Sequence, residues 1–158
     1  MYLERGWRQV VFEVKKMKFG PIYVDHIGIA VENLEEGSSF WRLLGLLENE
    51  NDELVQDQGV TTRFFSTSHG DKTEHPTQIE LLEATGPDTP IGKFIAKKGT
   101  GVQQVCFRVQ DLDGLIEYLI QNGITMIDAK PRKGSGGKMI AFVHPKSTGG
   151  VLVELTQA

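Results

Sequence analysis

VDHIGIAV, residues 24–31, recurs in outline as VQQVCFRV, residues 102–109. In both stretches apolar residues alternate with polar or small ones, which is the period of a β-strand whose two faces differ. Other markers repeat at the same distance of 78 positions: His26 and Gln104, Leu34 and Leu112, Gly45 and Gly123. The chain therefore consists largely of two copies of one unit.

Each copy continues with a helix and three further strands. Asn33 and Asp111 are capping residues for the two helices, which Gly45 and Asn122-Gly123 end. The expected strands are residues 46–54, 60–65 and 78–82 in the first copy, and 124–128, 139–143 and 151–155 in the second. Each unit thus has the order βαβββ, and the fold class is α+β.

A short helix between the copies is expected to begin at Thr89-Pro90 and to end at Gly99. The domain organisation follows from these boundaries. We predict an N-terminal extension at 1–22, a first module at 23–83, a linker helix at 84–100 and a second module at 101–158, with 23–158 forming one compact domain.

Bulk properties exclude several classes of protein. The formal net charge of −4 argues against a nucleic-acid binder, and no apolar run is long enough to span a membrane. The single Cys106 excludes an internal disulfide and fits a reducing compartment. Residues 1–16 lack the apolar core of a secretory signal, and Glu4 and Glu13 disfavour a transit peptide, so we predict a cytoplasmic protein.

Alternation along the strands also predicts a site. Four polar residues of the expected strands each lie next to at least one apolar residue. If those apolar neighbours pack under the helices, the polar side chains face the other, concave side of the sheet: His26, Glu80, Gln104 and Glu154. Two carboxylates neutralise a divalent cation, and this oxygen-rich set suits Mn, Co or Mg better than a thiolate zinc site does. Without an ion the two carboxylates should repel, and one should take up a proton.

Four stretches resemble one known family: residues 25–31, 79–83, 87–91 and, most specifically, HPKSTGGVLVEL at 144–155. They are similar to the methylmalonyl-CoA epimerases of the vicinal oxygen chelate superfamily, from about Tyr23 to the C-terminus. The resemblance implies paired βαβββ modules that form an open, cup-shaped sheet, in a homodimer. It also implies one divalent metal ion (Co, Mn, Zn, Ni or Mg), whose ligands fall here on His26, Glu80, Gln104 and Glu154.

The chemistry that the resemblance implies is removal of the proton α to a thioester and its return to the opposite face, through a metal-stabilised enolate. A base is needed on each face. Glu154 is retained and serves one face. The glutamate that bacterial epimerases carry for the other face is replaced by Thr62, and the nearby Asp57 is a possible substitute.

A second departure concerns the metal. The family usually has a His-His pair where this chain has Gln103-Gln104, and a glutamine at the position of Glu80. Amide and carboxylate ligands have thus traded places, which should weaken the binding of soft or borderline metals.

Basic side chains are the candidates for contact with an acyl-CoA. Lys138, His144 and Lys146 lie in the part of the chain that borders the acyl-CoA in the family, although ordinary solvated charges fit the same pattern. Arg63 and Arg108 are expected to point inward, to pair either with a substrate carboxylate or with Glu80 or Asp57.

Two other functions stay open. One is a related reaction of the same superfamily, a glyoxalase-type isomerisation or a dioxygenation. An iron dioxygenase needs two histidines and one carboxylate, and only one histidine remains here. The other is a non-catalytic member that binds a metal or a small acyl ligand, a function that Thr62 and Gln104 favour.

Overall fold

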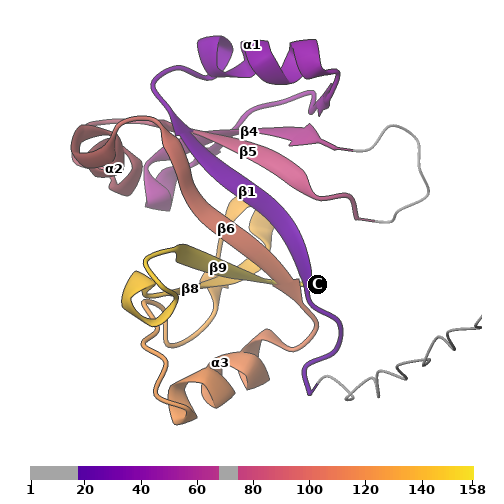
Figure 1. The fold of residues 1–158 in the computed structure, drawn as a ribbon, viewed down its shortest axis with the longest axis vertical. Coiled ribbons are helices and arrows are strands. Elements are labelled where there is room, and N and C mark those ends of the chain that lie inside the picture. The colour runs from indigo at the N-terminus through magenta and orange to yellow at the C-terminus, as the bar shows by residue number, and fades with distance from the viewer. Residues whose placement is uncertain (1–17, 68–74) are drawn as a thin grey trace, which may run out of the picture.

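The computed structural model describes residues 18–67 and 75–158, so most of the predicted N-terminal extension lies outside the described residues. The described residues contain three α-helices and nine strands. They form an α+β fold (Figure 1). The strands are β1 (Tyr23–Val31), β2 (Leu47–Glu48), β3 (Glu53–Val55), β4 (Val60–Ser66), β5 (Gln78–Ala84), β6 (Gly101–Val109), β7 (Arg132–Lys133), β8 (Met139–Val143) and β9 (Leu152–Gln157). The helices are α1 (Leu34–Leu44), α2 (Pro90–Lys98) and α3 (Leu112–Gln121).

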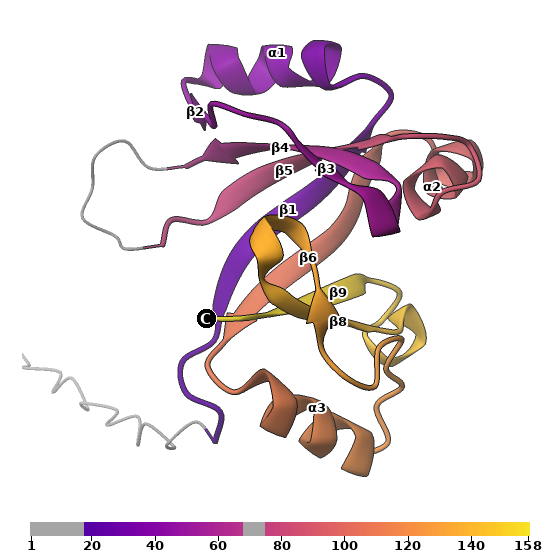
Figure 2. The same ribbon diagram turned by 180° about the vertical axis from the view of Figure 1, so that it is seen from behind.

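All described strands belong to one sheet, in the order β2-β4-β5-β1-β6-β9-β8-β7, with β3 paired to β4. The two modules meet at β1 and β6, which run antiparallel in the middle of the sheet. Each module repeats one pairing, because β1 is parallel to β5 and β6 is parallel to β9. The expected pair of βαβββ modules in an open sheet is confirmed (Figures 1 and 2).

The helices begin and end where the sequence indicates. Asn33 and Asp111 each accept a hydrogen bond from a backbone N–H of the first helical turn. Gly45 ends α1 in the left-handed conformation, with a φ of 90°. Helices α1 and α3 lie at opposite ends of the molecule, each covering the outer face of its own module, as Figure 1 shows.

The apolar side chains on these outer faces form the core. Leu34, Phe65 and Leu81 pack between α1 and the first half of the sheet, while Leu112, Ile116 and Leu155 are buried between α3 and the second half. A third cluster joins α2 to the first module. The inner face carries both polar side chains and apolar ones such as Phe64, Leu82 and Ile140.

Two expected strands are wrong. Residues 46–54 form two short strands because Asn49, Asn51 and Asp52 lie in a turn between β2 and β3. Residues 124–128 make only an isolated bridge, between Met126 and Val143, and the two strands that pair with β8 are β7 and β9. In the described residues no helix is long and apolar enough to cross a membrane.

Candidate functional site

The inner face of the sheet encloses a cavity of about 570 Å³ that both modules line. The four side chains expected on this face all line it: His26, Glu80, Gln104 and Glu154. Each of them is 7% exposed or less. Alternation along β1, β5, β6 and β9 therefore correctly indicated which side chains meet.

Strand register brings these residues together. Gly28 of β1 lies opposite both Glu80 of β5 and Gln104 of β6. A side chain at this position would come within 2.6 Å of the Gln104 Cγ, so the glycine leaves the space that Gln104 fills. Glu154 enters from β9, opposite Cys106.

Four polar atoms lie close together at the centre of the site. His26 Nε2 is 3.1 Å from Glu80 Oε2 and 3.4 Å from Glu154 Oε2. Gln104 Nε2 donates a hydrogen bond of 2.6 Å to Glu154 Oε2 and lies 3.5 Å from Glu80 Oε2. The carboxamide thus turns its NH₂ group, and not its oxygen, toward the two carboxylates.

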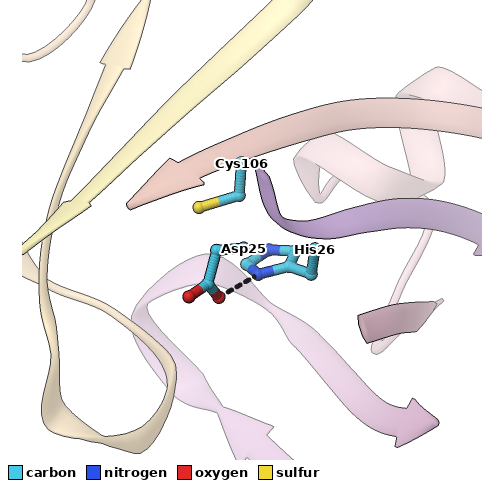
Figure 3. A group of neighbouring side chains, drawn as sticks. All are labelled: Asp25, His26 and Cys106. Atoms are coloured by element: carbon cyan, nitrogen blue, oxygen red, sulfur yellow. Dashed lines mark hydrogen bonds and ion pairs between the residues drawn. The ribbon is translucent and has the colours of Figure 1, made fainter. Parts of the chain in front are cut away.

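The histidine is oriented from behind by Asp25. His26 Nδ1 and Asp25 Oδ1 are 2.9 Å apart (Figure 3). The other oxygen of Asp25 lies 3.3 Å from Arg108 Nη1, and Lys138 Nζ is 3.8 Å from Oδ1. A carboxylate bonded to Nδ1 sets the tautomer of the ring and directs Nε2 at the cavity. Nε2 itself is buried and makes no aligned hydrogen bond there.

Charges in this cluster shift the pKa values of its members. Burial disfavours the charged imidazole, but the hydrogen bond with Asp25 and the close contacts with Cys106, Glu154 and Glu80 outweigh it and raise the pKa of His26. Burial is also the main cause that raises the pKa of Glu80, although His26 opposes it. The expectation that one of two converging carboxyl groups would be driven toward its neutral form agrees with the direction of the Glu80 shift.

Asp25 is a site residue that sequence reasoning missed. Strict alternation would turn Asp25 and His26 to opposite faces, but the pairing of β1 with β6 shifts register between Val24 and His26. Such a bulge turns two consecutive side chains to the same side. Thr156 was also missed, although alternation from Glu154 indicates it. Its hydroxyl lines the cavity and has no hydrogen-bond partner.

Asp25, His26 and Cys106 form a second group whose ligand atoms lie within 4.8 Å of one another (Figure 3). Three such residues could hold a metal ion. Burial raises the pKa of Cys106 to about 12, so a metal bound here would have to displace the thiol proton. The oxygen-rich set around Nε2 is the better match for a divalent cation.

Both residues considered for the second face of a substrate lie on the cavity wall. Thr62 is 2% exposed, and its hydroxyl has no hydrogen-bond partner. Asp57 lies at the rim, where its side chain is 65% exposed and its carboxylate is 3.8 Å from Arg132 Nη1.

The five basic candidates lie in different places. Lys138 lines the cavity. Arg108 lies behind the site, where its guanidinium forms an ion pair with Asp25. His144 and Lys146 lie together in the loop before β9, where the His144 ring accepts the Lys146 N–H, and neither lines the cavity.

The expected inward direction of Arg63 is wrong. Arg63 follows Thr62 along β4, so alternation sends its side chain to the outer face. There its guanidinium bonds to Asp52 at 2.7 and 2.8 Å and to Glu35 at 3.0 Å. The pair with Glu35 ties α1 to β4, and Arg63 does not meet Glu80 or Asp57.

Comparison with known proteins agrees with the fold. Residues 25–142 match the family model described as the glyoxalase/bleomycin resistance protein/dioxygenase superfamily. The chain is 35% identical to the uncharacterized Bacillus subtilis protein YqjC, over 85% of this chain and 91% of that protein. It is 32% identical to the ethylmalonyl-CoA/methylmalonyl-CoA epimerase of Cereibacter sphaeroides, over 85% of this chain and 96% of the enzyme.

Among solved structures, a variant of Streptomyces coelicolor methylmalonyl-CoA epimerase, in complex with 2-nitronate-propionyl-CoA, superimposes with a TM-score of 0.78. The identity is 32%, and the match covers 86% of this chain and 94% of the epimerase. The chain therefore belongs to the glyoxalase/bleomycin resistance protein/dioxygenase superfamily and, within it, to the methylmalonyl-CoA epimerase family.

Proposed function

We propose that this protein is an isomerase that inverts the carbon α to the thioester of methylmalonyl-CoA or a close relative. The observation that carries the proposal is the meeting of His26, Glu80, Gln104 and Glu154 in one cavity. In support, one relative that matches over 96% of its length is an ethylmalonyl-CoA/methylmalonyl-CoA epimerase, and one solved neighbour is a methylmalonyl-CoA epimerase in complex with methylmalonyl-CoA.

The donor set fits a divalent cation. His26 Nε2 is buried without an aligned partner, and two carboxylate oxygens lie beside it. His26, Glu80, Gln104 and Glu154 would hold the ion, Gln104 through Oε1 after its carboxamide has turned over. A bound ion would supply Lewis acidity toward the thioester oxygen and would neutralise the two carboxylates. The three oxygen ligands favour Mn, Co or Mg.

Glu154 and Asp57 divide the proton transfers in this proposal. The carboxylate of Glu154 accepts the proton from the α-carbon, and the electron pair of the broken C–H bond moves onto the thioester oxygen. Asp57, exposed at the rim, takes up a proton from solvent and delivers it to the opposite face. The electron pair returns to carbon, and Glu154 releases its proton to solvent. Thr62 cannot act as a base at neutral pH, and we assign its buried hydroxyl to hydrogen bonding with the ligand.

The rest of the cavity suits an acyl group on a charged carrier. Phe64 and Phe142, which lie opposite Glu80 and Glu154 in their strand pairs, line the inner wall together with Ile140. Lys138 and Arg132 line the cavity with half-exposed or exposed side chains that can meet the negative charge of a phosphate or carboxylate.

Solvent exchange tests the proposal. Methylmalonyl-CoA of one α-carbon configuration is incubated in deuterium oxide with the protein and Co²⁺ or Mn²⁺. It is expected to gain deuterium at the α-carbon and to become a mixture of the two epimers at a similar rate. In Asp57→Asn deuterium gain should continue while epimerisation slows, because Glu154 alone can only return a deuteron to the face from which it took the proton. Mass spectrometry and chiral analysis of the same samples measure both rates. Absence of wash-in by the metal-loaded wild type would contradict the proposal.

A second candidate function is non-catalytic binding of an acyl-CoA, which Gln104 and Thr62 favour because they replace a usual ligand and a usual base. Thioester binding without wash-in would support this function. A single cavity histidine among the described residues counts against an iron dioxygenase. The homodimer and the cytoplasmic location stay predictions.

A further inference from the structure

An acid of the first module is bound by a glycine-rich loop of the second. Glu53 of β3 accepts two hydrogen bonds from the Gly136 N–H, at 2.8 Å to Oε1 and 3.0 Å to Oε2. The Ser135 hydroxyl donates a third hydrogen bond, to Oε2. All three residues line the cavity, and this contact bridges the two modules beside it. None of them takes part in the proton transfers proposed above.

The loop, residues 134–138, is braced by contacts of its own. The Gly134 N–H donates to the Lys138 carbonyl at 2.8 Å, and the Gly137 N–H donates to the Gly134 carbonyl at 3.1 Å. A side chain at Gly134 would come within 2.6 Å of Ile140 Cδ1, so the loop lies directly on β8. Gly136 has a φ of +62°, which favours glycine and leaves its N–H directed at Glu53. The loop is thus held by contacts besides those with Glu53.

Positive charge surrounds the same loop. Lys133 precedes it and Lys138 ends it, and both are exposed. Lys138 and Arg132 also line the cavity. Backbone N–H and hydroxyl donors within a basic surrounding form a binding site for an oxyanion, and a carboxylate already occupies these donors.

We propose that the loop at 134–138 is an oxyanion site of the ligand cavity and that Glu53 occupies it until a ligand displaces the side chain. The ligand group is a carboxylate or a phosphate, since both accept the same donors. Glu53 is half-buried at the rim and becomes free to enter water when it is displaced. Occupation by an internal acid lowers the apparent affinity for the ligand, because the ligand binds only the fraction of molecules in which the donors are free.

The test is calorimetric titration with two probes. Malonate carries carboxylates without a phosphate, and coenzyme A carries phosphates without a carboxylate. Glu53→Ala is expected to bind at least one probe about threefold more tightly than the wild type does, a modest gain because the contact is partly exposed. The probe that gains identifies whether the site takes a carboxylate or a phosphate.

The control is Glu117→Ala, which removes one exposed acid from α3 and so changes the net charge equally. The gain in Glu53→Ala must exceed that of the control, and adding Ser135→Ala must reverse it by removing the hydroxyl donor. Equal or weaker binding of both probes by Glu53→Ala would overturn the proposal and make Glu53 a support for the loop. Should Glu53→Ala fail to fold, Glu53→Gln keeps the size of the side chain and should shift the affinity in the same direction.

The identity of the ligand rests on the proposed function, but the titration does not. Neither probe is turned over, so the affinities can be compared even if the protein shows no deuterium wash-in. A failure of the isomerase proposal and a failure of the oxyanion site are therefore distinguishable.

Discussion

Replacement of Glu154 by glutamine is expected to lower the rate of α-proton exchange by about a thousandfold, the contribution typical of a well-placed general base. Glutamine has the shape of glutamate, and its oxygen can still accept the hydrogen bond from Gln104 Nε2, which is 2.6 Å long in the wild type. The fold should therefore persist while the group that accepts the proton is lost. Deuterium wash-in at saturating thioester and metal measures the effect.

Glu80→Gln is the matched control, because Glu80 is the other buried carboxylate beside His26 Nε2. It removes one charged oxygen ligand but no proposed base. Excess metal should restore most of its activity and little of that of Glu154→Gln. If metal restored both variants equally, Glu154 would be a ligand only and the base would have to be sought elsewhere.

The second large effect is expected at Gln104. Gln104→His should raise the affinity for Zn²⁺, Ni²⁺ and Co²⁺ by about tenfold or more and leave that for Mg²⁺ nearly unchanged, because imidazole nitrogen suits the borderline metals. The metal-free protein should lose about 1–3 kcal/mol of stability, since the bond to the buried Glu154 carboxylate is lost. Metal titrations and urea denaturation with and without metal check the two parts.

Gln104→Met keeps the length of the side chain and removes both polar atoms. It should weaken the binding of Mn²⁺ and Co²⁺ if the carboxamide oxygen is a ligand. Unchanged metal affinities in both the His and the Met variants would mean that Gln104 is not a ligand and only donates hydrogen bonds to the carboxylates of the metal-free site.

Much of the fold was predictable because local signals and the repeat agree. Asn33, Asp111 and Gly45 cap or end helices by short-range hydrogen bonding, which sequence expresses directly. The strands expected at 46–54 and 124–128 were wrong, because apolar content alone does not show where strand pairing is interrupted. In the first of them turn-forming polar residues interrupt the pairing. In the second the Asp128 carboxylate accepts the Phe142 N–H.

The site was predictable where strands are regular and not where they bulge. Alternation indicated His26, Glu80, Gln104 and Glu154, whereas the register shift that turns Asp25 toward His26 has no signature in the residues themselves. The outward direction of Arg63 could have been predicted. The alternation that turns Thr62 into the cavity wall turns the next residue, Arg63, to the outer face. Which end of the Gln104 carboxamide faces the carboxylates depends on the partners around it and not on the sequence pattern.

Anomalous diffraction from a crystal of the protein grown with Mn²⁺ would test the central claim most directly. We expect one strong peak per chain within about 2.5 Å of His26 Nε2, Gln104 Oε1 and an oxygen of each of Glu80 and Glu154. A peak on the Nδ1 side of the ring, between Asp25 and Cys106, or no peak in the cavity, would contradict it.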